Sequence, residues 1–161
     1  MTAMEFTAFV RVDDRLIHGQ VVTSWVKSLS TRRIWVVSDR SRQEPIEIIL
    51  LKSSVPPFLA LEVLSVQEAV DACLESHTLI LLERLQDAVT LCRAGMPIRD
   101  INVGGLRYQP GRVGLSKSVY VGPEDVVALH ALQALCVDTE IRVLPSDRRL
   151  DAYARLAQRW P

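Results

Sequence analysis

The sequence predicts an α/β fold, specifically a three-layer α/β/α single domain around a mainly parallel open sheet with one antiparallel edge strand. Short β-branched runs alternate along the whole chain with segments whose apolar residues recur at helical spacing. One run, residues 78–82, reads TLILL and is apolar from Leu79 onward, as expected of a central parallel strand covered on both faces. A chain of 161 residues suits one domain, so residues 1–161 are expected to fold as a single unit.

The first half of the chain supplies three predicted strands. Residues 6–10 form a short buried strand, a polar turn occupies residues 11–20, and apolar residues at helical spacing follow it. Residues 33–38 form the second strand and residues 39–42 a polar loop. Pro45 opens a helix with an apolar stripe at Ile46, Ile49, Leu50 and Leu51. After a strand at 60–64, Ser65 and Glu68 predict a capping box for a helix over 66–75.

The second half continues the alternation. After the strand at 78–82, a helix over 85–94 is ended by Gly95, and a strand at 98–103 stops at Gly104-Gly105. Residues 106–118 are predicted as a surface excursion with a short strand around 118–121. A helix follows Pro123. Residues 140–144 alternate as a half-exposed strand, which we place at the antiparallel edge, and residues 148–159 form the last helix.

Composition excludes several classes of protein. Lysine plus arginine equal aspartate plus glutamate at 19 each, so no global charge recruits nucleic acid. The three cysteines are widely spaced without a C-x-x-C pair, and we expect neither a disulfide nor a metal site. No apolar run approaches the roughly 20 residues that span a bilayer, and the N-terminus lacks the pattern of a signal peptide. These features predict a cytoplasmic protein.

The most informative segment is the polar turn over residues 11–20, which reads RVDDRLIHGQ. His18 stands where the first strand hands over to a helix. In an open α/β sheet this handover lies at the carboxyl edge, where ligands bind and where free helix N–H groups attract anions. A histidine flanked there by Arg11 and Arg15 indicates phosphate chemistry. A nucleotide-binding domain is the weaker alternative, because no G-x-G-x-x-G motif follows the first strand.

This turn resembles the active-site loop of the IIB components of the mannose/fructose/sorbose family of the sugar phosphotransferase system, which carry R-[IV]-D-D-R-L-I-H-G-Q-V. Further similarity appears at Trp25, at residues 34–39 and at residues 102–105. The resemblance implies a phosphocarrier in which His18 accepts a phosphoryl group from the IIA component. The group then passes to a sugar entering through the membrane components IIC and IID, to which the protein would be peripheral. No cofactor, ATP or metal is implied.

Physical chemistry suggests roles for the residues around His18. Phosphoryl transfer depends mostly on positioning and on neutralising charge, which is work for guanidinium groups and helix N-terminal amides. Arg15 is assigned the main stabilisation of the phosphoryl group and Arg11 is the second cation. Asp13 or Asp14 could fix which imidazole nitrogen attacks, or could hold an arginine in place.

The remaining predicted site residues border His18. Small Gly19 admits an incoming phosphohistidine, and its N–H and that of Gln20 belong to the anion-binding helix end. A wall of the site is predicted from residues of the fifth strand, namely Asn102, Gly104 and Gly105; the two glycines could equally be a plain strand-ending turn.

One departure from the family pattern lies at Glu83-Arg84, where family members usually have an uncharged polar residue near the phosphate. A carboxylate facing the phosphate would repel it, whereas Arg84 could supply positive charge, so the outcome depends on which side chain points inward. This departure motivates the alternative of a regulatory or sensory IIB-like module that signals through its phosphorylation state. The sugar, and the choice between a monomer and a homo-oligomer, stay open.

Overall fold

The central sheet is seen in the computed structural model, which describes residues 8–161. Within that range, a 7-stranded sheet has the order β3-β2-β4-β1-β5-β8-β9, and a separate 2-stranded hairpin pairs β6 with β7. All pairs in the large sheet are parallel except β8 with β9. The strands are β1 (Phe9–Asp13), β2 (Arg33–Val37), β3 (Ala60–Leu64), β4 (Thr78–Leu82), β5 (Asp100–Gly105), β6 (Val113–Gly114), β7 (Tyr120–Val121), β8 (Asp138–Ile141) and β9 (Leu150–Asp151).

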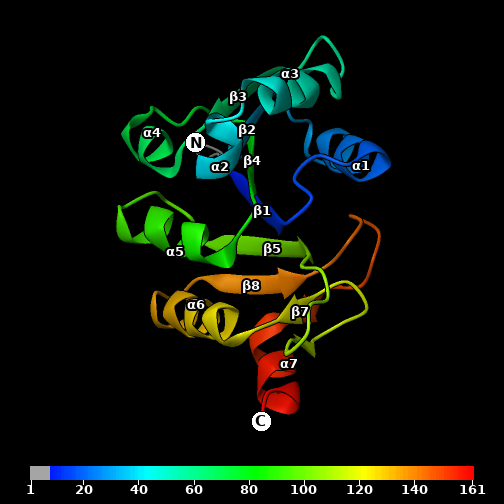
Figure 1. The fold of residues 1–161 in the computed structure, drawn as a ribbon, viewed down its shortest axis with the longest axis vertical. Helices are drawn as coiled ribbons and strands as arrows, with labels where there is room; N and C mark the ends of the chain where they lie inside the picture. The colour runs from blue at the N-terminus through cyan, green and yellow to red at the C-terminus, as the bar shows by residue number, and fades with distance from the viewer. Residues whose placement is uncertain (1–7) are drawn as a thin grey trace, which may run out of the picture.

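Helices cover both faces of the sheet, which confirms the three-layer α/β/α architecture (Figure 1). One apolar cluster joins the sheet to α1 and α3, and the other joins it to α4, α5, α6 and α7. Strand alternation explains the division, because Ile34 and Val36 belong to the first cluster while Trp35 and Val37 belong to the second. The helices are α1 (Gly19–Leu29), α2 (Asp39–Arg42), α3 (Pro45–Ser53), α4 (Val66–Asp71), α5 (Leu85–Arg93), α6 (Pro123–Ala134) and α7 (Ala152–Arg159).

Strand β1 extends further into the polar motif than the sequence predicts. Residues 11–13 belong to the strand and not to the turn, while residues 6 and 7 of the predicted strand lie outside the described residues. Within β1, Val10 and Val12 enter the cluster formed with α5 and α6. Their neighbours face the opposite way, and Phe9 stacks on Trp25 of α1 with ring centroids 4.7 Å apart. The same alternation turns Arg11 and Asp13 toward α1.

The antiparallel edge strand exists, but it is β9 and not residues 140–144. Strand β8 pairs in parallel with β5, and β9 pairs antiparallel with β8 at the edge of the sheet. The prediction was wrong because a glutamate at position 140 suggested a solvent-exposed edge strand. In the structure Glu140 is buried and forms an ion pair with Arg142 at 2.8 Å. The last helix starts at Ala152, where Asp151 caps it by accepting hydrogen bonds from two backbone N–H groups.

Other local predictions have mixed outcomes. The capping box of Ser65 and Glu68 is confirmed by both of its hydrogen bonds, although α4 ends at Asp71 and not at residue 75. Residues 39–42 form a short helix and not a loop, because the Ser38 hydroxyl accepts a hydrogen bond from the Ser41 N–H.

The predicted apolar stripe of α3 is only partly buried. Leu51 packs into the core, whereas Ile46 is 74% exposed, Ile49 66% and Leu50 61%. No helix within residues 8–161 is long and apolar enough to cross a membrane.

Candidate functional site

The loop that carries His18 is fixed at both ends by the sheet and by helix α1. It leaves β1 at Asp13, and the next residue, Asp14, donates its N–H to the carbonyl of Gly105 on neighbouring β5 at 3.0 Å. A tight turn follows, in which the N–H of Leu16 bonds to the carbonyl of Asp13 at 2.9 Å. Leu16 has a positive φ of 56°, and its side chain is buried in the cluster beneath α1. The chain then delivers His18 to the N-cap position of α1.

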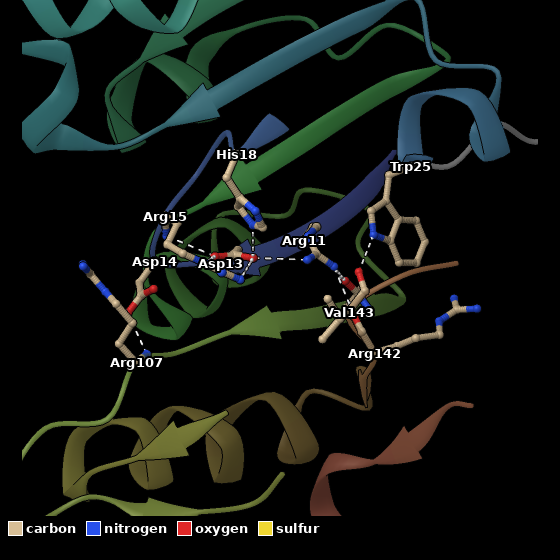
Figure 2. Close-up of polar contacts among 10 residues, drawn as sticks. Arg11, Asp13, Asp14, Arg15, His18, Trp25, Arg107, Arg142 and Val143 are labelled. Atoms are coloured by element: carbon tan, nitrogen blue, oxygen red, sulfur yellow. Dashed lines mark hydrogen bonds and ion pairs between the residues drawn. The ribbon is translucent and has the colours of Figure 1, made fainter. Parts of the chain in front are cut away.

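His18 is oriented by the carboxylate of Asp13, with Nε2 of the imidazole 3.0 Å from Oδ2 (Figure 2). An ionised carboxylate can only accept hydrogen bonds, so Nε2 carries the proton in this contact. The other ring nitrogen, Nδ1, then holds a lone pair in the neutral imidazole. With its side chain 25% exposed, His18 can be reached by a second molecule. The arrangement leaves Nδ1 as the ring nitrogen that does not face Asp13.

Asp13 is a buried carboxylate that stays ionised because cations surround it. Burial alone would raise its pKa, but hydrogen bonds from Arg15 and His18, together with the nearby charge of Arg11, lower the pKa of Asp13 below its usual value. Arg15 donates three bonds to this carboxylate, from the backbone N–H, Nε and Nη2, at 3.1, 3.1 and 3.3 Å. The Arg15 side chain is 42% exposed, so it stands at the surface beside the imidazole.

Arg11 supports the site from below and does not reach the surface. Its side chain is only 1% exposed, and Nη2 pairs with Oδ2 of Asp13 at 3.1 Å. Nη1 donates to Asn102 Oδ1 at 2.6 Å and to the carbonyl of Arg142 at 3.1 Å, and the guanidinium lies over the ring of Trp25. Burial lowers the pKa of Arg11, and Asp13 opposes that effect. This burial and these hydrogen bonds fit the orienting role expected of Arg11 better than a direct contact with phosphate.

The two glycines at the end of β5 make space for these arginines. A Cβ on Gly104 would lie 2.0 Å from Nη2 of Arg11, and one on Gly105 would lie 2.9 Å from Nη2 of Arg15. Both residues belong to the strand, so the alternative of a plain strand-ending turn is wrong. Asn102 lies in the same strand, accepts a hydrogen bond from Arg11 and donates its own amide to the Arg142 carbonyl at 3.1 Å.

Asp14 and Asp13 have separate partners, which distinguishes two residues that the sequence left equivalent. Asp14 accepts hydrogen bonds from the backbone N–H of Arg107 at 2.8 Å and from its Nε at 3.3 Å. It therefore ties the loop to the segment after β5, away from the imidazole (Figure 2). Of these two carboxylates, only that of Asp13 forms a hydrogen bond with His18. Asp13 both fixes the imidazole and holds arginines, so both of its proposed roles coexist in one residue.

Helix α1 begins directly after His18. Gly19 and Gln20 occupy its first turn, where backbone N–H groups lack partners within the helix and favour an anion. Gly19 has a positive φ of 37°, and nothing lies within 4 Å of the position of a Cβ there. The side chain of Gln20 lies outside the described part of the chain.

The side chains of Glu83 and Arg84 are engaged by partners other than His18, in a pocket that they line together with Asp14 of the His18 loop. The Glu83 carboxylate accepts hydrogen bonds from the Ser38 hydroxyl at 2.8 Å and from Arg40 Nη2 at 2.8 Å. Arg84 is 62% exposed and approaches Asp87 at 3.6 Å. Arg40 therefore neutralises the negative charge of Glu83, which was expected to repel the phosphate. Arg84 points toward Asp87 of α5. Among the described residues, no hydrogen bond or ion pair joins Glu83 or Arg84 to His18.

Trp25 and Arg142 complete the site without having been predicted for it. Trp25 Nε1 donates to the carbonyl of Val143 at 2.8 Å, and the Arg142 guanidinium lies 4.9 Å from the Trp25 ring centroid. Trp25 could have been recognised from the sequence because it is one of the positions that resemble the family. Arg142 could not, because it supports Arg11 through its backbone carbonyl, and a sequence pattern records side chains only. Within residues 8–161, no three His, Cys, Asp or Glu side chains are grouped so as to hold a metal ion.

Comparison with known proteins places this geometry in a family. A fructose-specific EIIB component of a phosphotransferase system (PTS) from Bacillus subtilis is 37% identical over 146 residues, covering 88% of this chain and 90% of that protein. The crystal structure of the IIBSor domain of the sorbose permease from Klebsiella pneumoniae superposes with a TM-score of 0.89 at 31% identity, covering 94% and 96% of the two chains.

A longer relative shares the same region. The mannose-specific EIIAB component of Escherichia coli is 31% identical over 145 residues, which are 87% of this chain but 45% of that protein. The family model described as the PTS system sorbose subfamily IIB component matches residues 7–159. The chain therefore belongs to the sorbose subfamily of IIB components of the sugar phosphotransferase system.

Proposed function

We propose that His18 is the residue on which this IIB component carries its phosphoryl group, and that Nδ1 is the atom that bonds to phosphorus. IIB components accept a phosphoryl group from IIA and transfer it to a sugar, and this chain acts as such a carrier and sugar phosphotransferase. The observation that supports the choice of atom is the 3.0 Å contact between Nε2 of His18 and Oδ2 of Asp13, which occupies the other ring nitrogen.

Each transfer exchanges one bond to phosphorus for another. In the first, the Nδ1 lone pair of His18 forms a P–N bond while the P–N bond to the donor histidine of IIA breaks. In the second, a sugar hydroxyl forms a P–O bond, the P–N bond to His18 breaks and the hydroxyl proton passes to solvent water. Asp13 stabilises Nε2–H throughout, which keeps Nδ1 as the reacting atom.

Charge on the transferring oxygens is neutralised by Arg15 and by the first turn of α1. Arg15 donates hydrogen bonds from Nε and Nη2 to Asp13, and these bonds fix its guanidinium group next to His18. Nη1 is then left as a donor for the phosphoryl group. Arg11 acts indirectly, through Asp13, because its buried guanidinium keeps the Asp13 carboxylate ionised and in place. Asn102, Gly104 and Gly105 position Arg11 and Arg15 and do not themselves contact the phosphoryl group.

The partners follow from the same assignment. Membership of the family implies cooperation with IIA, IIC and IID components, and one relative combines a IIA and a IIB component in its name. We assign to this chain a IIA donor of its own system and a sugar presented by membrane IIC and IID components. The protein would then work in the cytoplasm, at the inner face of the membrane.

The regulatory alternative has no support from the comparisons. The relatives described above are named as sugar-specific components of phosphotransferase systems. The residue that motivated the alternative, Glu83, is neutralised by Arg40 and does not contact His18 within the described residues.

Intact-mass measurement after incubation with phosphorylated IIA tests the proposal. The native chain should gain the mass of one phosphoryl group, labile in acid, and His18→Ala should gain none while keeping the same circular dichroism spectrum. His130→Ala is the matched control, because His130 is exposed on α6, and it should be phosphorylated normally. Phosphorylation of His18→Ala, or none of the native chain, would overturn the assignment.

A further inference from the structure

A second cleft, separate from His18, opens between the β6–β7 hairpin, the segment after β8 and helix α7. Its volume is about 630 Å³, and its lining includes Leu115, Arg142, Asp147 and Arg155. Pockets that hold small molecules typically have volumes of roughly 300–1,000 Å³. The cleft is therefore large enough for a metabolite. Figure 1 shows β7 and α7, two of the elements that supply its lining residues, next to each other at the lower end of the molecule.

The cleft concentrates positive charge in a chain whose formal net charge is zero. Lysine and arginine side chains line it, and Asp147 is the single acidic residue in the lining. Within residues 8–161, no ion pair engages the four exposed or half-exposed cations Lys117, Arg148, Arg155 and Arg159. The charge that a ligand would meet is therefore not already neutralised by the protein.

Helix α7 places two of these cations where they repel each other. Arg155 and Arg159 stand four residues apart, so they lie on the same face of α7, and both line the cleft. Like charges at this spacing destabilise a helix unless an anion lies between them. Two guanidinium groups on one face are also well suited to bind phosphate oxygens.

The floor of the cleft has a different character. Leu115, Ile141 and Leu150 line it together with the ring of Tyr120, while Ser116 and Ser118 add hydroxyl groups. An apolar floor under a cationic rim suits a ligand with a carbon skeleton and several negative charges better than it suits a bare inorganic anion. We propose that this cleft binds a small organic molecule bearing at least two phosphate groups, a ligand beyond the phosphoryl chemistry at His18.

The cleft and the His18 site share one wall, which contains Arg142 and Val143. The carbonyls of Arg142 and Val143, at the edge of the cleft, accept the hydrogen bonds from Arg11 and Trp25 that support the site. The four unpaired cations do not take part in that network. A test must therefore separate binding in the cleft from binding beside Arg15.

Isothermal titration calorimetry on the full chain provides the test. A hexose bisphosphate and ATP serve as the two probes, since sugar and nucleotide skeletons are the alternative sources of the same phosphate chemistry; the unphosphorylated hexose and inorganic phosphate are the comparators. We expect saturable binding of at least one probe at a single site, and binding at least tenfold weaker for the comparators. Absence of binding by both probes would overturn the proposal.

Charge-matched variants locate the site. The double variant Arg148→Gln/Arg155→Gln should weaken binding of the probe at least tenfold. Arg93→Gln/Arg99→Gln removes two exposed arginines elsewhere and should bind as the native chain does. Arg15→Gln should also retain binding, which separates this cleft from the His18 site and makes the result independent of the proposed phosphocarrier function. Equal losses in the two double variants, or a loss confined to Arg15→Gln, would contradict the proposal.

Discussion

Replacing Asp13 by asparagine removes the one carboxylate that joins Arg11, Arg15 and His18 while nearly keeping its shape. Removing one partner of a buried ion pair typically costs about 3–5 kcal/mol of stability. Arg11 is 1% exposed but keeps its bonds to Asn102 and to the Arg142 carbonyl, which places the expected loss near the lower end, at about 3 kcal/mol. Arg15, at 42% exposed, adds little because solvent screens it.

The same substitution should slow phosphoryl transfer more than it weakens the fold. An amide can donate as well as accept, so it no longer requires the proton to sit on Nε2 of His18, and we expect the transfer rate to fall about 100-fold or more. Urea unfolding measures the stability, and rapid-quench transfer from phosphorylated IIA measures the rate. Asp14→Asn is the control, because Asp14 bonds to the exposed Arg107 and not to His18. A folded Asp13→Asn protein with the native transfer rate would refute the reasoning.

Three further predictions concern the same site. Gly104→Ala should lower the free energy of unfolding by about 1–3 kcal/mol, because its methyl group would lie 2.0 Å from Arg11; an unchanged urea midpoint would contradict this. Because the folded-state pKa of Asp13 is lowered, its contribution to stability is complete above about pH 4 and is lost at lower pH. The native chain should therefore lose stability in acid more steeply than Asp13→Asn, and parallel pH profiles would exclude this cause. Glu83→Gln should change the transfer rate by less than about threefold, since Arg40 already neutralises Glu83; a tenfold increase, worth about 1.4 kcal/mol, would show that the carboxylate repels the phosphate.

The sequence predicted the layers of the fold well because apolar periodicity records burial directly. The run over residues 78–82 is the central strand β4, and all five of its residues are buried. Periodicity failed where a polar residue was buried with a partner, as at Glu140, and where an apolar residue was left in water, as at Ile46. Neither situation can be recognised without knowing which segments are neighbours in space.

The candidate site shows the same division. His18 and Arg15 could be proposed from the sequence alone because the motif brings them together locally. The role of Arg11 could not, since it depends on the alternation of β1 and on residues far along the chain, Asn102 and Arg142. The separation of Asp13 from Asp14 likewise depends on Arg107, which lies 93 positions beyond Asp14.

The absence of side chains at Gly104 and Gly105 has a consequence for moving this site to another protein. The strand beside β1 supplies empty space that two guanidinium groups fill, so the ten-residue motif is only half of the reactive unit. Grafting residues 11–20 onto a different parallel sheet would force Arg11 and Arg15 against the Cβ atoms of the adjacent strand. A working transplant must therefore carry two segments, the motif and its glycine-bearing neighbour, in the same register.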